Sequence, residues 1–309
     1  MENLIKYGVF EEVLDEGQNM IGSRWVITMK EKADGQKTNY KGRLVARGFQ
    51  EKEAPQSDSP MMLQESMKMF FSVAANQGFA LRSIDIRAAF LQAKELDREF
   101  FLKPPKYIKK EGILWKLKKP LYGLNDASQK FWLKVKMVFS EMGLKRLEGD
   151  KAVYYKHDEA GKLHGMVSTH VDDFTLAGKD DFIEHITKEI NKALDVSKVE
   201  DGMFRFTGID VKQTENGVVL SMEDYAQSLE EIQIREDRSD EVLSREEMKL
   251  LRKYVGKLNL LAANTRPDLS IYALDLAKKQ KVATLKDLRS INRILKKVQE
   301  NECKSFSPR

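Results

Sequence analysis

The stretch STHVDDFTLAG, residues 168–178, sets two adjacent carboxylates, Asp172 and Asp173, inside an apolar run typical of β-strands. The β-forming residues in and beside it are Met166, Val167, Val171, Phe174 and Leu176. They predict a half-buried pair of strands. Strands are depleted in Asp, because its short polar side chain packs poorly on a pleated surface. The two acids therefore need a reason of their own.

Two explanations fit the acidic pair, and both stay open on this stretch alone. Asp tolerates turn geometry and bonds its own backbone, so the pair is typical of a tight hairpin turn. Two carboxylates at a hairpin tip also suit a hard cation such as Mg²⁺, which takes oxygen ligands. The stretch predicts a hairpin in either case, with or without a metal.

The composition is that of a soluble globular protein. Of 309 residues, 41% are hydrophobic and 33% charged, enough for a sizeable core that we expect to divide into two or more subdomains. No run approaches the roughly 18 apolar residues of a membrane helix, and the N-terminus lacks the layout of a signal peptide, so we expect an intracellular protein. The single cysteine, Cys303, excludes an internal disulfide, and the four histidines lack zinc-site spacing.

The charges are unevenly distributed along the chain. The net charge is only +5, but residues 24–52, 103–151 and 252–309 each carry more Lys and Arg than Asp and Glu, whereas residues 180–247 are acidic. Basic segments that converge on one cleft would suit a polyanion, because each neutralised phosphate releases counterions and adds affinity. Ordinary solvated helix faces would give the same composition, so both interpretations remain.

The first half of the chain predicts a hairpin, a helix and a second acidic strand. Residues 24–49 form the hairpin, with its turn at Asp34-Gly35 and with Lys41, Arg43 and Arg47 on its second arm. Residues 61–78 have helical spacing and end at a glycine. Residues 79–93 then predict a short strand and a helical turn, and Asp85 lies between two isoleucines of that strand.

The rest of the chain alternates strands with helices and becomes helical toward its end. A strand and turn over 113–124 precede a helix over 126–143, for which Asp126 is the expected N-cap. The further expected elements are strands within 151–178 with a turn at Asp158–Gly161, a helix near 180–195, strands over 204–221 with a turn at Asn216-Gly217, and helices near 222–231, 245–263, 268–281 and 284–299.

If Asp85 and the Asp172-Asp173 hairpin occupied adjacent strands of one sheet, three carboxylates would repel one another. Two unit charges 4 Å apart cost roughly 4 kcal/mol at an effective dielectric constant near 20. Divalent cations would offset that repulsion, and two metals about 4 Å apart form the clamp that polymerases use for nucleotidyl transfer. Spacing in the sequence leaves this convergence a hypothesis.

The order of the motifs resembles the reverse transcriptase domain of copia-type LTR retrotransposon polyproteins. The matching landmarks, in the family's order, are RWV (24–26), YKGRLVARGF (40–49), SIDIRAAFLQ (83–92), WKLKKPLYGLNDAS (115–128), HVDD (170–173) in place of the usual YVDD, FTGIDV (206–211) and YVGKLNLLAANTRPDLS (254–270). The resemblance covers nearly the whole chain, from about residue 10 to 300.

This resemblance implies an α+β right-hand polymerase fold and an RNA-directed DNA polymerase. It assigns 20–80 and 97–150 to the fingers, 81–96 and 151–221 to the palm, and 222–309 to thumb and connection helices. It makes Asp85, Asp172 and Asp173 the catalytic residues that bind Mg²⁺, with Mn²⁺ as the alternative ion. The implied partners are an RNA template, a DNA primer or RNA–DNA hybrid, and dNTPs, with no membrane. The family works in cytoplasmic particles and its product enters the nucleus.

The same resemblance implies residues that bind the incoming nucleotide. They are Lys41, Arg43 and Arg47 for the triphosphate, Phe90 as the bulky residue that blocks a ribose 2′-hydroxyl, and Tyr122 and Gly123 as a turn against nucleotide and template. Simpler explanations stay open: Phe90 as core packing, Gly123 as an ordinary turn, and at least one of the three cations as a solvated surface charge.

Several residues depart from the family pattern. His170 replaces the usual tyrosine beside the primer, and Ser128 and Gln129 replace a proline and a basic residue that follow the LYGL turn. We expect this chain to lack the ribonuclease H domain that follows in the family. Two alternatives follow: an inactive nucleic-acid-binding remnant, which would bind without extending a primer, and an RNA-dependent RNA polymerase, against which Phe90 argues.

Overall fold

The computed structural model describes residues 1–30, 39–52, 57–236, 239–279 and 282–300. The chain divides into two compact units: unit 1 comprises Met1–Ser66 and Ser83–Val199, and unit 2 comprises Met67–Arg82 and Glu200–Arg309. The fingers, palm and thumb ranges given above stay predictions.

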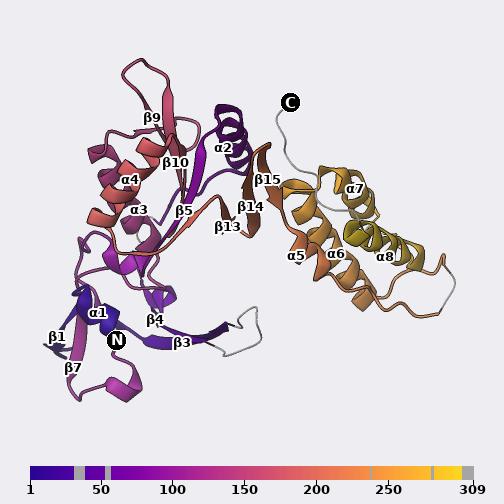
Figure 1. The fold of residues 1–309 in the computed structure, drawn as a ribbon. Coiled ribbons are helices and arrows are strands. Elements are labelled where there is room, and N and C mark those ends of the chain that lie inside the picture. The colour runs from indigo at the N-terminus through magenta and orange to yellow at the C-terminus, as the bar shows by residue number, and fades with distance from the viewer. Residues whose placement is uncertain (31–38, 53–56, 237–238, 280–281, 301–309) are drawn as a thin grey trace. The chain divides into compact units, whose positions relative to one another are not determined.

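A six-stranded sheet in the order β12-β5-β11-β10-β9-β8 is the framework of unit 1 (Figure 1). Its strands are β5 (Ala80–Ile86), β8 (Lys145–Arg146), β9 (Val153–His157), β10 (Leu163–His170), β11 (Asp173–Gly178) and β12 (Val196–Asp201). Two helices of this unit are α3 (Ala127–Glu141) and α4 (Asp180–Ala193). Phe139 of α3 meets the buried Phe174 of β11 with ring centroids 5.5 Å apart. The apolar residues of the opening stretch therefore anchor the acidic hairpin to a helix.

The expected hairpin of residues 24–49 is confirmed in its two arms. β3 (Ser23–Lys30) pairs antiparallel with β4 (Asn39–Ala46), and Trp25 lies opposite Leu44. The expected turn at Asp34-Gly35 lies outside the described residues. A short 3₁₀ helix, η1 (Gly48–Gln50), follows β4.

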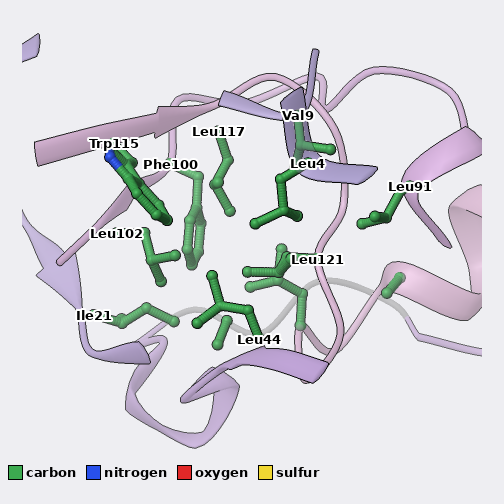
Figure 2. Close-up of a cluster of buried hydrophobic side chains, with 13 residues drawn as sticks. Leu4, Val9, Ile21, Leu44, Leu91, Phe100, Leu102, Trp115, Leu117 and Leu121 are labelled. Atoms are coloured by element: carbon green, nitrogen blue, oxygen red, sulfur yellow. The ribbon is translucent and has the colours of Figure 1, made fainter. Parts of the chain in front are cut away.

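A second sheet, in the order β1-β7-β6-β2, shares a core with this hairpin. Its elements are β1 (Phe10–Leu14), β2 (Met20–Ile21), β6 (Phe101–Leu102) and β7 (Ile113–Leu117), and helix α1 (Glu2–Lys6) precedes them. Figure 2 shows Leu44 of β4 pointing into the same buried cluster as Phe100, Trp115 and Leu121. The basic arm of the hairpin is thereby fixed to the segment that precedes α3.

Unit 2 contains a three-stranded antiparallel sheet and the late helices. Its elements are α2 (Gln64–Gln77, begun in unit 1), β13 (Met203–Phe206), β14 (Ile209–Thr214), β15 (Gly217–Ser221), α5 (Glu223–Gln227), α6 (Arg245–Asn264), α7 (Ser270–Lys278) and α8 (Leu285–Glu300). Phe71 of α2 packs edge-on against Phe206 of β13 at 6.5 Å. A capping box between Ser244 and Glu247 starts α6. α5 ends four residues before the expected boundary near 231.

Asp126 occupies the N-cap position of α3 as expected, but its side chain makes no capping hydrogen bond to the helix. Its buried carboxylate accepts hydrogen bonds from Arg98 instead. None of the helices in the described part of the chain has the length and apolar composition that a membrane span requires.

Candidate active site

The sheet order brings Asp85 beside the acidic hairpin. β5 lies next to β11, and the amide of Ile86 donates a 2.9 Å hydrogen bond to the carbonyl of Asp172. His170 and Asp173 face each other as the last paired residues of β10 and β11, which leaves Val171 and Asp172 as the turn. Three carboxylates from two distant parts of the sequence therefore meet in unit 1.

Val171, counted among the strand-forming residues in the sequence, lies in the turn of the hairpin. Its φ is +58°, a left-handed conformation that β-branched residues rarely adopt, so it turns the chain instead of extending it. Strain of this kind gathers at functional sites, where the surrounding structure holds it. Here it presents Asp172 as an exposed residue at the tip.

The carboxylates are close enough to change one another's ionisation. Burial, then the charges of Asp172 and Asp85, raises the pKa of Asp173 from 3.8 to about 6, and a hydrogen bond with Asp85 acts in the same direction. The hydroxyl of Ser197 donates to the carboxylate of Asp85. The two neighbouring carboxylates therefore make Asp173 harder to ionise.

Oxygen donors of this kind suit Mg²⁺, and a bound cation would offset the repulsion between their charges. Among the described residues, no group of three or more His, Cys, Asp or Glu side chains is already arranged to hold a metal ion. The oxygen donors of the three aspartates fit Mg²⁺, but their carboxylates would have to move closer together to coordinate one ion.

A cleft of about 540 Å³ opens beside these carboxylates. Of the residues predicted from the sequence, it is lined by Lys41, Arg43, Asp85, Tyr122 and Asp172. Cations on β4 thus share one cavity with carboxylates on β5 and at the hairpin tip. Such a cavity suits a ligand that carries phosphates and meets a metal at one end.

Arg43, Tyr122 and Phe90 form one contiguous contact. The Arg43 guanidinium carbon lies 5.9 Å from the centroid of the Tyr122 ring, and that ring lies 5.1 Å from the Phe90 ring. Burial and the charge of Asp172 raise the pKa of Tyr122, and Arg43 opposes both. Tyr122 therefore stays a neutral phenol that holds the Arg43 side chain at the cleft.

Other predicted residues lie outside the set that lines the cleft. Arg47 is exposed at the end of β4, and Phe90 is half-buried against the core cluster. Gly123 has φ +86°, and a Cβ there would come within 2.3 Å of the carbonyl oxygen of Ala46. Gly123 is thus required by the fold, because it lets the turn after Tyr122 pack on β4.

His170 lies beside the acidic pair on β10 and is half-buried. Burial lowers its pKa, and the charge of Asp172 opposes that shift. The imidazole is therefore mostly neutral at neutral pH.

Some residues of the cleft were not predicted from the sequence. They are Met1–Leu4, Trp25, Gly42, Leu44, Ile86–Ala88, Leu91, Leu121 and Ser197. Ser197 lies on β12, which no periodic pattern predicted. Glu2, Asn3 and Leu4 belong to the five-residue helix α1, and Met1 is its N-cap. Only tertiary structure brings these groups to the cleft.

Comparison with known proteins gives a consistent set of relatives. Residues 8–239 match the family described as reverse transcriptase (RNA-dependent DNA polymerase). The chain is 27% identical over 297 residues to a retrovirus-related Pol polyprotein from transposon RE1 of Arabidopsis thaliana, covering 90% of this chain and 20% of that protein. It is 27% identical over 235 residues to the corresponding polyprotein from transposon TNT 1-94 of Nicotiana tabacum, covering 73% of this chain and 18% of that one.

Two solved structures share the fold. A foamy viral protease-reverse transcriptase in complex with double-stranded DNA matches with a TM-score of 0.59 and 16% identity, over 99% of this chain and 47% of that one. A foamy viral protease-reverse transcriptase in complex with an RNA/DNA hybrid matches with a TM-score of 0.56 and 16% identity, over 100% of this chain and 37% of that one. The predicted polymerase fold and the copia-type resemblance are confirmed, and the chain spans about a fifth of the length of the curated relatives.

Proposed function

This chain belongs to the reverse transcriptase (RNA-dependent DNA polymerase) family, and from that premise we propose that it copies an RNA template into DNA. The 3′-hydroxyl oxygen of a primer attacks the α-phosphorus of a dNTP, the bond from that phosphorus to the bridging oxygen breaks, and pyrophosphate leaves. The hydroxyl proton is lost, and the primer is one nucleotide longer.

One observation carries the proposal beyond family membership. Asp85 and Asp173 are remote in the sequence, yet the charge of Asp85 raises the pKa of Asp173, and Asp85 lines the same cleft as Asp172, Lys41 and Arg43. Carboxylates at one end of a cavity and cations along its wall match the two needs of phosphoryl transfer, namely metal ligands and charge stabilisation on phosphate.

Asp85 and Asp172 are the residues that we assign as the main Mg²⁺ ligands, with Asp173 assisting. When bound, Mg²⁺ lowers the pKa of the attacking hydroxyl and stabilises the leaving pyrophosphate. Because Asp173 has a pKa of about 6, its carboxylate is mostly ionised at pH 7.5 and available as a ligand. Ser197 orients the Asp85 carboxylate by donating a hydrogen bond to it.

Lys41 and Arg43 are the cations that we assign to the triphosphate, because they line the cleft whereas Arg47 does not. Tyr122 supports Arg43 through its ring. Phe90 packs against Tyr122, and we assign its bulk to disfavouring a ribose 2′-hydroxyl. His170, next to the acidic turn, would contact the primer backbone.

The proposed nucleic-acid partner is a primer annealed to an RNA template. The two solved relatives were bound to double-stranded DNA and to an RNA/DNA hybrid. The basic segments of this chain would contact phosphates with little sequence preference, so binding should weaken steeply as salt concentration rises.

Primer extension tests the proposal and separates it from an inactive binding remnant. A labelled DNA primer on an RNA template is incubated with dNTPs and Mg²⁺, using the native chain and an Asp172→Asn, Asp173→Asn double variant, and hybrid binding is measured in parallel. We expect both proteins to bind and only the native chain to extend. Binding by both without any extension would reject the polymerase and leave the remnant.

A further inference from the structure

A partly buried ionic cluster is formed by Glu51, Arg98 and Asp126, and we term it the Arg98 cluster. Arg98 Nε and Nη2 donate to Glu51 Oε1 at 3.1 and 2.8 Å. Its Nη1 and Nη2 donate to Asp126 Oδ2 and Oδ1 at 2.5 and 3.2 Å. The side chains of Glu51 and Asp126 are only 9% and 1% exposed. One guanidinium therefore holds two carboxylates that are almost withdrawn from water.

The Arg98 cluster joins the two chain segments that carry Arg43 and Tyr122. Glu51 directly follows η1, five residues after the end of β4, and Asp126 follows the Tyr122-Gly123 turn at the start of α3. Between these points the amide of Ala46 donates to the carbonyl of Tyr122 at 2.7 Å.

The contact between the two segments leaves no spare room. A Cβ on Gly48 would come within 2.1 Å of the carbonyl oxygen of Gly123. Asn125 Nδ2 donates to the carbonyl oxygen of Gly48 at 3.3 Å. A shift of η1 away from the turn would therefore break several contacts together.

Stability alone explains this arrangement poorly. Withdrawing ions from water costs about as much as their attraction returns, and apolar side chains of the same volume often stabilise a fold equally well. A bidentate guanidinium adds geometric specificity, because its planar set of N–H groups donates to a carboxylate in one orientation. The cluster thus specifies where η1 lies relative to the start of α3.

We infer that Arg98 is a positioning residue for nucleotide binding. By tying Glu51 to Asp126, it holds the end of β4 against the Tyr122 turn, so that Arg43 and Tyr122 meet at the wall of the cleft. The expected consequence, tighter dNTP binding, rests on the proposed function. The position of the end of β4 can be tested without any catalysis.

The conservative variant Arg98→Lys tests the structural part. Lysine keeps the charge and loses the bidentate geometry, so the fold survives while the position of η1 is no longer specified. We expect the Ala46 amide to exchange its hydrogen several-fold faster than in the native chain, as followed by NMR without any nucleotide. Arg205→Lys is the matched control, because Arg205 makes a bidentate pair with Asp210 outside the cleft. Unchanged exchange at Ala46 in Arg98→Lys would overturn the inference.

Steady-state extension tests the consequence. Arg98→Lys should raise the KM for dNTP about five- to tenfold, and should leave kcat and hybrid affinity within about twofold of native values. Glu51→Gln, which weakens one side of the cluster, should raise the KM less. An unchanged KM alongside faster Ala46 exchange would overturn the positioning role. A native chain that extends no primer would instead reject the proposed function, and the exchange measurement would still decide whether Arg98 holds β4.

Discussion

At the scale of single residues, the fold places the carboxylates of Asp85, Asp172 and Asp173 close together although their charges repel one another. Asp173 has a pKa raised to about 6 because it is partly buried beside Asp172 and Asp85. A structural turn would not need three carboxylates within electrostatic reach, since an exposed pair would serve it equally well. Of the two explanations first offered for the acidic stretch, the turn is present, and the charge crowding favours the metal.

Phe90 offers a test of substrate selection at one residue. Its ring lies against Tyr122, which lines the cleft, so removing the ring should open space for a 2′-hydroxyl. We expect Phe90→Ala to reduce the preference for dNTPs over rNTPs by at least about tenfold, measured as a ratio of kcat/KM values.

Tyr107→Ala is the matched control for Phe90, because Tyr107 is an aromatic residue that is 96% exposed. It should retain native discrimination. If Phe90→Ala also retained it, Phe90 would be core packing only, and the assignment as a steric block would be wrong.

At the scale of elements, the turn after β7 decides where β4 lies. Gly123→Ala would place a Cβ 2.3 Å from a backbone oxygen at φ +86°, so we expect a loss of about 3 kcal/mol or more in the free energy of unfolding. Gly112→Ala is the control, since its φ is +67° with nothing within 4 Å, and strain alone should cost about 1–2 kcal/mol. Urea unfolding of both variants measures the difference, and equal losses would refute the close packing.

Helix α1 gives a prediction that depends on pH. Hydrogen bonds from Lys6 and Tyr7 lower the pKa of Asp195 below 3.8. Because the folded pKa is depressed, the ionised carboxylate stabilises the fold above the unfolded pKa, and that contribution disappears as pH falls through the folded value.

Asp195→Asn should therefore unfold at a lower temperature than the native chain at pH 6, and the gap should narrow as pH falls below 3.8 and through the lowered folded pKa of Asp195. Thermal unfolding across this range checks the sign. A gap that stays constant with pH would show that the pairing with Lys6 contributes no pH-dependent stability.

Local signals predicted the longer elements well. The glycines that end the helices over 61–78 and 126–143 lie just past α2 and α3, at φ +62° and +75°. β2 and β6 were not predicted, because each has only two residues and they pair in parallel across about eighty positions of sequence. A strand of two residues spans a single period of the alternation, so no repeating pattern can predict it.

The candidate site was predicted in part, for a related reason. Motif order placed Asp85, Asp172 and Asp173 in one site, and the structure brings them together. No pattern in the sequence indicated the roles of Ser197 and of the Arg98 cluster, because both depend on contacts between segments that are far apart in sequence.

At the scale of the whole molecule, the family and the fold agree while the chemistry remains a proposal. The family match spans residues 8–239, and the solved relatives share the fold at 16% identity. The chain is a fifth of the length of its relative from transposon RE1, so activities of the longer polyprotein do not transfer to it by similarity. What this chain can do depends on its own cleft.

The most direct test of the account compares two isosteric substitutions in the initial rate of dNTP incorporation with Mg²⁺. Asp85→Asn removes one carboxylate charge from the cleft, whereas Asp97→Asn removes one from an exposed pair with Lys130 in the same unit. We predict that Asp85→Asn lowers the rate by at least about 10²-fold and Asp97→Asn by less than about twofold. Equal rates for Asp85→Asn and the native chain would contradict the assignment of this cleft as the polymerase site.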